Sequence, residues 1–194
     1  CTMNRCLHAG LLLGMLLVAT SSAMAQPYRD ATLTVDQRVA DLLPRLTVEE
    51  KFWQLFMLAG SLDQGVERYN DGAFGFQLGK ACDGQDPVAC ANRIQRHFVE
   101  NTRLGIPMIL FEESLHGLVQ TGATAYPQAI GLAASFDADL MAEVATAMAD
   151  EARARGIRQV LSPVVNLASD VRWGRTEETY GEDPLLSAVM GAAF

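Results

Sequence analysis

Residues 112–117 contain side chains that can handle protons and bind hydroxyl groups. Glu112 and Glu113 are adjacent, and His116 follows Glu113 by three positions. Adjacent strand residues point to opposite faces, so only one of these glutamates can face a shared site while the strand continues. Acid–base catalysis by the two neighbours as a pair is therefore disfavoured. His116 could bind substrate, shuttle a proton or brace the loop, and the residue types alone leave all three roles open.

A second polar segment, residues 170–183, suits a ligand that is rich in hydroxyl groups. Trp173 offers a flat face for a sugar ring or for packing in a core. The guanidinium of Arg175 offers a planar fork of donors for hydroxyl groups or for a neighbouring carboxylate. A surface turn rich in salt bridges is the simpler alternative, and it stays open at this point.

Both polar segments come after short apolar runs that predict buried strands. The first segment directly follows one run, and the second comes shortly after another. Functional groups of parallel α/β proteins gather at the carboxyl ends of strands, so this placement favours a site there. Four runs are too short for helices and predict strands buried on both faces, namely residues 56–59, 73–78, 106–111 and 160–165.

Helices are predicted between the strands by their terminal residues. Thr47, with Glu50 three positions later, is a capping box that starts a helix through about residue 55. Asp86 and a following proline start a second helix, which is expected to end at residues 104–105. The buried face predicted for the second helix consists of Val88, Ala91, Ile94 and Phe98.

A third helix is expected from Asp137 to Gly156. Alternating strands and helices imply parallel crossovers and hence an α/β sheet or barrel. An eight-stranded barrel typically needs about 250 residues, whereas this chain has 194, and residues 185–194 have the pattern of a helix cut off in mid-run. We therefore expect an incomplete barrel. The buried face predicted for the third helix consists of Leu140, Met141, Val144, Ala145, Met148 and Ala152.

Residues 1–25 have the three parts of a secretory leader, with Arg5, an apolar stretch and a small-residue end at 23–25. About 11 consecutive apolar residues are too few to cross a bilayer, which takes roughly 20. We expect an exported protein, periplasmic or extracellular, from which this leader is removed. Residues 26–46 are expected to lead into a domain that spans residues 47–194.

The formal net charge of the chain is −8 at pH 7. An acidic surface repels phosphate backbones and anionic lipid, so we expect neither nucleic acid nor a membrane surface as a partner. The strand ends show no glycine-rich phosphate loop of the required spacing, which disfavours an enzyme with an anionic substrate. Neutral carbohydrates remain suitable substrates, and the composition does not indicate an oligomeric state.

Cys82 and Cys90 are the two cysteines outside the expected leader. In an oxidising compartment we expect them to form a disulfide that staples a loop, and two free thiols are the alternative. The chain has only His97 and His116 outside the leader, and it lacks the close spacing of a zinc site. We therefore expect no metal and no cofactor.

Four motifs carry a family resemblance. They are RLGIP at 103–107, ESLHG at 113–117, YPQAIGLAASFD at 126–137, and RWGR at 172–175 with YGEDP at 180–184. In this order and spacing, the chain resembles the N-terminal domain of glycoside hydrolase family 3, the family of β-glucosidases and β-xylosidases. The resemblance runs from about residue 46 to the last residue.

The resemblance implies the N-terminal part of a TIM-like (β/α)8 barrel and a retaining mechanism with two carboxyl groups. Glu113 matches the carboxylate that holds hydroxyls of the terminal sugar, and Arg175 matches the arginine that holds the same ring. His116 is expected to bind substrate as well, with Trp173 and Glu178 in support. The nucleophile Asp and the acid/base Glu would lie beyond residue 194, so this chain would contain no catalytic residue and be inactive alone.

The sugar preference depends on Glu113, because the family often has Asp at this position. Glutamate reaches about 1.3 Å further. Its carboxylate must fold back or intrude where a hexose carries its hydroxymethyl group. The leading prediction is an exo-acting β-glucosidase that releases terminal β-D-glucosyl residues from oligosaccharides or glycosides. The alternatives are a β-xylosidase of the same family and a non-catalytic sugar-binding module.

Overall fold

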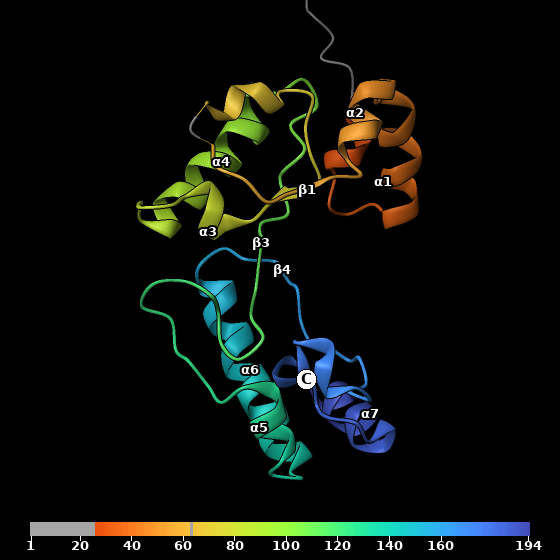
Figure 1. Ribbon diagram of the computed structural model, residues 1–194. Helices are drawn as coiled ribbons and strands as arrows, with labels where there is room; N and C mark the ends of the chain where they lie inside the picture. Colours follow the sequence, from red (N-terminus) through yellow and green to blue (C-terminus); the bar gives the residue numbers. More distant parts are fainter. Residues whose placement is uncertain (1–25, 63) are drawn as a thin grey trace, which may run out of the picture. The chain divides into compact units, whose positions relative to one another are not determined.

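The computed structural model describes residues 26–62 and 64–194 (Figure 1). The leader predicted at residues 1–25 lies outside the described residues. The chain divides into two compact units, one ending at Arg45 and the other spanning Leu46–Phe194. None of the helices in the described part is long and apolar enough to span a bilayer.

The first unit is a short helical segment. Helix α1 begins because the Thr34 hydroxyl accepts the backbone N–H of Gln37, whose side chain accepts the N–H of Thr34 in return. The sequence interpretation treated residues 26–46 as a leading segment and did not predict this helix. Its elements are η1 (Pro27–Arg29), α1 (Val35–Leu42) and η2 (Leu43–Arg45).

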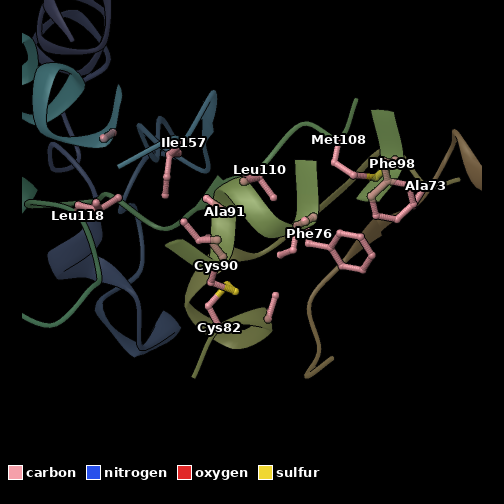
Figure 2. Close-up of a cluster of buried hydrophobic side chains, with 14 residues drawn as sticks. Ala73, Phe76, Cys82, Cys90, Ala91, Phe98, Met108, Leu110, Leu118 and Ile157 are labelled. Carbon is pink, nitrogen blue, oxygen red and sulfur yellow. A yellow bond between two sulfur atoms is a disulfide. The ribbon is translucent and has the colours of Figure 1, made fainter. Parts of the chain in front are cut away.

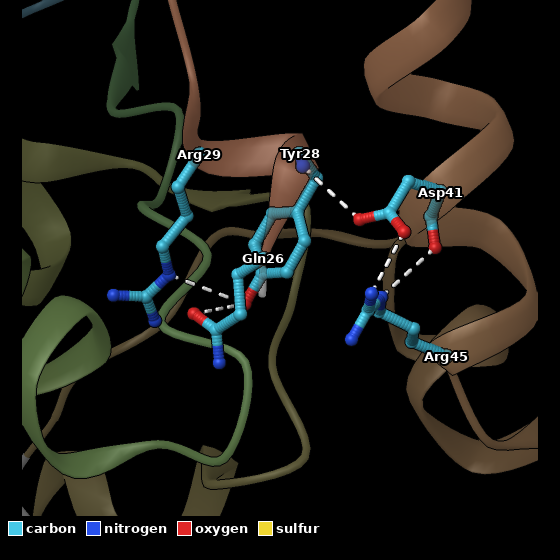
Figure 3. Close-up of polar contacts among 5 residues, drawn as sticks. All are labelled: Gln26, Tyr28, Arg29, Asp41 and Arg45. Atoms are coloured by element: carbon cyan, nitrogen blue, oxygen red, sulfur yellow. Dashed lines mark hydrogen bonds and ion pairs between the residues drawn. The ribbon is translucent and has the colours of Figure 1, made fainter. Parts of the chain in front are cut away.

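Polar contacts around Tyr28 hold the first unit together (Figure 3). The backbone N–H of Tyr28 donates to the carboxylate of Asp41 at 3.0 Å, and Arg45 pairs with the same carboxylate at 2.7 Å. The Tyr28 hydroxyl donates to Gln26 and accepts from Arg29. The tyrosine is therefore fixed at its backbone and at its ring end, and it is buried.

The second unit contains parallel strands in chain order. Strands β1 and β2 pair in parallel, and so do β3 and β4. A parallel bridge between Gln77 and Phe111 joins the end of β2 to β3, so each strand lies next to its successor. This order is the one expected at the start of an α/β barrel, and the described residues do not close it. The strands are β1 (Met57–Leu58), β2 (Gly75–Phe76), β3 (Phe111–Glu112) and β4 (Gln159–Val160).

Each predicted strand run overlaps one observed strand, but the runs at 106–111 and 160–165 share only Phe111 and Val160 with β3 and β4, and three runs are less buried than expected. Phe56 is 39% exposed, Ile109 is 36% exposed and Val165 is 58% exposed, so burial on both faces was wrong for the runs at 56–59, 106–111 and 160–165. Between β1 and β2 the described residues contain only the short η3 (Val66–Tyr69), and no long helix covers that side. Burial on both faces requires a layer of helices on each side of a sheet.

The helices begin where the sequence predicts. Thr47 and Glu50 form the expected capping box, and the carboxylates of Asp86 and Asp137 accept backbone N–H groups of the first turns that follow them. The chain also ends in a helix, as its last residues indicate. The remaining elements are α2 (Val48–Trp53), α3 (Leu78–Ala81), α4 (Pro87–Asn101), α5 (Ala129–Ala133), α6 (Ala138–Ala154), η4 (Val171–Trp173), η5 (Thr176–Glu178) and α7 (Pro184–Ala193).

The buried faces of α4 and α6 are narrower than predicted. Val88 is 42% exposed and Leu140 is 41% exposed, because both lie beside the buried stripe of their helix rather than on it. Val144 is half-buried. Cys90 takes the place that Val88 was expected to occupy in the core of α4, and α4 ends at Asn101 rather than at residues 104–105. The buried residues are Cys90, Ala91, Ile94 and Phe98 in α4 and Met141, Ala145, Met148 and Ala152 in α6.

A core of buried side chains joins β2, α3 and α4 to Met108 and Leu110, which precede β3, and to Ala152 of α6 (Figure 2). The predicted disulfide between Cys82 and Cys90 is confirmed, and it lies within this core with an S–S distance of 1.99 Å. At Gly75, β2 lies close to the segment that precedes β3, and a Cβ atom there would lie 1.6 Å from the carbonyl oxygen of Ile109. A second buried cluster joins α5, α6 and α7.

Candidate functional site

The two glutamates at the end of β3 have different surroundings, as the alternation of strand side chains predicts. Glu112 is 1% exposed. Its carboxylate accepts hydrogen bonds from the Gln77 side-chain amide at 2.7 Å, the backbone N–H of Gly79 at 2.6 Å and the backbone N–H of Glu113 at 3.0 Å. A cavity of about 270 Å³ lies on the Glu112 side, and Glu113 does not line it. The Glu112 carboxylate therefore has a structural role, because its hydrogen bonds are all made within the protein.

Glu113 is half-buried and lies in an electrostatic cluster with the second polar segment. Burial raises the pKa of Glu113 above its ordinary value, and the negative charges of Glu112 and Glu178 raise this pKa further. The positive charge of Arg175 opposes the rise. The fold thus brings the charges of Glu113, Glu178 and Arg175 within reach of one another, although the first follows β3 and the other two lie near the C-terminus.

Arg175 and Glu178 form a two-point ion pair. The Nε atom of Arg175 donates to Oε1 of Glu178 at 2.9 Å, and Nη2 donates to Oε2 at 2.6 Å. These bonds raise the pKa of Arg175 and lower the pKa of Glu178. The guanidinium carbon also lies 5.9 Å from the centroid of the Trp173 ring. The pair presets the direction of a guanidinium that remains 57% exposed.

Part of this loop is the simpler alternative predicted from the sequence, a surface turn rich in salt bridges. Arg172 pairs with Asp170 at 2.6 Å, and its side chain is 88% exposed. Arg175 and Trp173 differ from Arg172 because they stack against one another, and the charge of Arg175 reaches Glu113. The loop therefore contains one solvated pair and one pair directed towards the candidate site.

His116 braces its loop. Its Nδ1 atom lies 3.1 Å from the carbonyl oxygen of Tyr126, and the backbone N–H of Tyr126 donates to the carbonyl oxygen of His116 at 2.7 Å. Because a carbonyl oxygen can only accept, this contact requires the proton on Nδ1. Of the three roles considered for His116, the geometry displays the brace, while substrate binding stays a prediction.

Together, the half-buried carboxyl of Glu113, the exposed guanidinium of Arg175 and the Trp173 ring suit a neutral ring with several hydroxyl groups. A carboxylate accepts hydrogen bonds from hydroxyls, a guanidinium donates to them, and an aromatic face covers the apolar side of a sugar. Within residues 26–62 and 64–194, no three His, Cys, Asp or Glu side chains group as a metal site. The arrangement is suited to binding and positioning rather than to bond cleavage by itself.

Sequence reasoning missed the hydrogen bonds around Glu112. Its two partners outside β3 lie 35 and 33 positions earlier in the chain, in Gln77 and Gly79. Neither residue type signals a partnership with a buried carboxylate at that distance. The only available signal was the alternation of strand faces, which assigns one glutamate of the pair to the interior.

Comparison with known proteins relates the chain to one family. The family model described as Glycosyl hydrolase family 3 N terminal domain matches residues 47–194. A protein named putative beta-xylosidase from Formosa agariphila is 32% identical over 182 residues, covering 86% of this chain and 24% of the relative. A probable beta-glucosidase C from Aspergillus flavus is 34% identical over 186 residues, covering 84% and 29%. A periplasmic beta-glucosidase from Salmonella typhimurium is 32% identical over 159 residues, covering 80% and 20%.

Solved structures agree with this relationship. A b-glucosidase from Erythrobacter marinus superposes with a TM-score of 0.76 at 33% identity, covering 87% of this chain and 24% of that one. A beta-glucosidase from Listeria innocua in complex with glucose superposes with a TM-score of 0.69 at 26% identity, covering 82% and 23%. The chain thus spans less than a third of the length of each of these proteins.

Proposed function

The chain belongs to glycosyl hydrolase family 3, and we propose that it forms the sugar-binding first part of an exo-acting, retaining β-glycosidase. Its fold is α/β, the N-terminal part of a TIM-like (β/α)8 barrel that is incomplete in this chain. The proposed reaction releases terminal β-D-glucosyl residues from oligosaccharides or glycosides. Relatives named beta-glucosidase and beta-xylosidase support a β-glycosidase.

The observation that carries this proposal is the cluster of Glu113, directly after β3, with Arg175 and Trp173 of the loop of residues 170–178. We propose that Glu113 accepts hydrogen bonds from hydroxyls of the terminal sugar and that Arg175 donates to the same ring, with Trp173 and Glu178 in support. Contacts of this kind position the ring and strengthen as it approaches the oxocarbenium-like transition state. His116 is proposed to complete this binding surface.

A retaining glycosidase also needs a nucleophile and an acid/base, with the two carboxyl groups about 5–5.5 Å apart. Glu112 is unsuited to either role, because it is buried and its carboxylate is already hydrogen-bonded by three donors. We propose that sequence beyond residue 194 supplies the nucleophile Asp and the acid/base Glu. The relatives, of which this chain covers less than a third, have the additional length that this requires.

We further propose that the protein is exported to the periplasm or beyond the cell, that residues 1–25 are its leader, and that residues 26–46 lead into the domain of residues 47–194. The disulfide between Cys82 and Cys90 fits an oxidising compartment. One relative is named a periplasmic beta-glucosidase. The net charge of −8 fits a neutral carbohydrate partner better than nucleic acid or a membrane surface.

The first test is to read the gene beyond codon 194. An open frame that adds an Asp-bearing strand would support the proposal, and the resulting longer protein is called here the extended polypeptide. An immediate stop codon would favour the sugar-binding module instead. The isolated 194-residue chain should hydrolyse no nitrophenyl β-glucoside above the buffer rate. Clear turnover by the purified chain would contradict the proposal that the nucleophile and the acid/base lie beyond residue 194.

The second test removes each binding group from the extended polypeptide. Glu113→Ala and Arg175→Ala should each lower kcat/KM for nitrophenyl β-glucoside by roughly 10²-fold, because each removes a charge-assisted bond to the transition state. Arg172→Ala is the matched control, since Arg172 is also ion-paired in this loop but 88% exposed. If the Glu113 or Arg175 variant kept a kcat/KM near that of the wild type and equal to that of Arg172→Ala, the residue would have a structural role only.

A β-xylosidase is the second candidate, and the choice depends on the Glu113 side chain, since a carboxylate that folds back leaves a pocket that still accepts glucose. A glutamate carboxylate that intrudes towards the sixth carbon of glucose would favour xylose, which lacks that group, and such differences are typically worth about 10 to 200-fold. Glu113→Asp in the extended polypeptide should then raise the ratio of glucoside to xyloside kcat/KM. An unchanged or lowered ratio would show that Glu113 does not select between the two sugars.

A further inference from the structure

We propose that Glu112 is a positioning residue whose buried carboxylate clamps the end of β3 to the start of α3 and thereby fixes the direction of Glu113. The clamp itself follows from the geometry of the chain, and its effect on substrate rests on the proposed glycosidase function. Glu112 does not touch substrate in this scheme. It acts through the backbone and the charge of its neighbour.

Three donors converge on the Glu112 carboxylate from separate parts of the chain. The Gln77 side chain lies at 2.7 Å, the backbone N–H of Gly79 at 2.6 Å and the backbone N–H of Glu113 at 3.0 Å. Hydrogen bonds to a buried carboxylate are short and strong, and losing one leaves a donor without a partner. The third bond holds the main chain of Glu113 itself, so the clamp acts directly on the residue that faces the proposed sugar.

Gln77 also connects the clamp to the strand ladder. Its backbone N–H donates to the carbonyl oxygen of Leu58 at 2.9 Å, and it forms a parallel bridge with Phe111. The residue that holds the Glu112 carboxylate is therefore hydrogen-bonded to β1 and paired with β3. The position of Glu113 is thus tied to three consecutive strands rather than to its own loop.

Gly79 provides the space in which the carboxylate sits. A Cβ atom at this position would lie 2.6 Å from Oε2 of Glu112, which is closer than real Cβ contacts allow. Any side chain at residue 79 must therefore push the carboxylate away from the backbone N–H that binds it. The contact between residues 79 and 112 therefore requires glycine at the first position and accommodates a carboxylate at the second.

The charge of Glu112 reaches the candidate site as well. It contributes to the raised pKa of Glu113, after burial, which is the larger cause. Removing that charge should lower the pKa of Glu113 towards its ordinary value. If ionised Glu113 binds the sugar, the acid limb of the pH profile of kcat/KM should move to lower pH by the same amount.

Two variants separate the geometry of the clamp from its charge. Glu112→Gln removes the charge and one acceptor, while Gly79→Ala keeps the charge and displaces the carboxylate. The matched control is Glu50→Gln, because Glu50 is the other buried glutamate among the described residues, at 8% exposed, and pairs with Arg103 instead. All three are made in the extended polypeptide, with isotope labels for NMR titration of the Glu113 carboxyl.

The clamp predicts a distinct pattern. Glu112→Gln should lower the Glu113 titration midpoint, and both Glu112→Gln and Gly79→Ala should move the Glu113 amide resonance and lower kcat/KM on the order of tenfold. Only Glu112→Gln should shift the acid limb, and Glu50→Gln should do none of these. An unmoved Glu113 titration and amide in Glu112→Gln would overturn the proposal. If the wild type hydrolyses no β-glycoside, the proposed function fails, while the NMR result still decides on the clamp.

Discussion

The end of β3 and the loop of residues 170–178 both supply charged groups to the candidate site, but they are held in different ways. At the end of β3, Glu112 is 1% exposed and is bound by donors from residues 33 and 35 positions away. In the loop, Arg175 has a side chain that is 57% exposed and is held by a carboxylate three positions away. One region depends on the tertiary fold, and the other depends on local sequence.

This difference implies different rigidity on the two sides of the proposed sugar. A buried carboxylate cannot leave its donors without a cost in desolvated, unpaired groups, so Glu113 should be fixed. Arg175 is held by its ion pair with Glu178 and its side chain is 57% exposed, so it should adapt its position to the ligand more than Glu113 does. We infer that the β3 end sets where the ring lies and that the loop adjusts to it.

The largest expected effect is on stability at the β3 end. Glu112→Ala leaves the Gln77 amide and two backbone N–H groups without their acceptor, and we expect a loss of about 3 to 5 kcal/mol in the free energy of unfolding. Arg172→Ala, in the loop, should leave the urea midpoint unchanged because that pair is solvated. Urea unfolding followed by circular dichroism measures both. Equal urea midpoints for the two variants would show that the β3 end is not held more strongly than the loop.

A smaller effect should follow from removing the disulfide. Replacing Cys82 and Cys90 with serine should cost about 2 to 3 kcal/mol, because the bond restricts a short loop in the unfolded chain. The disulfide begins directly after α3, which carries Gly79. Hydrogen exchange should therefore accelerate at residues 77–90 and remain unchanged at residues 170–178. Acceleration of equal size in the loop would show that the two regions are not independently held.

The smallest effect concerns acid. Folding lowers the pKa of Glu178 below its ordinary value of 4.5, so its stabilising pair with Arg175 is present above pH 4.5 and lost as the pH falls through the lowered pKa. The contribution of Glu113 to stability changes with pH in the opposite direction. Folding raises the pKa of Glu113, so its ionisation disfavours the folded state. Trp173 fluorescence in a Trp53→Phe background should change below pH 4.5. The Glu178→Gln variant, which lacks this titration, should show a flat signal over the same range.

The features that sequence predicted best are those with local causes. The capping box at Thr47 and Glu50 joins atoms three positions apart, and the disulfide joins two cysteines eight positions apart. The family motifs selected Glu113 and Arg175 as candidate binding residues through their neighbours in sequence. Each of these signals is complete within a short stretch of chain.

The features that sequence did not predict have distant causes. The partners of Glu112 depend on which strand lies beside β3, and the exposure of Phe56 depends on whether a helix covers β1. Val88 fits the apolar period of α4, but the rotation of α4 against the core decides that Cys90 is buried instead. Helix α1 was missed although Thr34 and Gln37 give it a capping box, so this signal was available in the sequence.

A saturation library at position 75 should return a single amino acid. The β2 backbone passes so close to the segment that precedes β3 that the first side-chain carbon would lie 1.6 Å from the carbonyl oxygen of Ile109. No rotamer relieves this overlap, since the main chain fixes Cβ. Selection for folded protein should therefore retain only glycine codons here, whereas Val119, which is 56% exposed, should accept many substitutions. In a genetic screen, this close backbone approach would appear as a codon at which only synonymous changes survive.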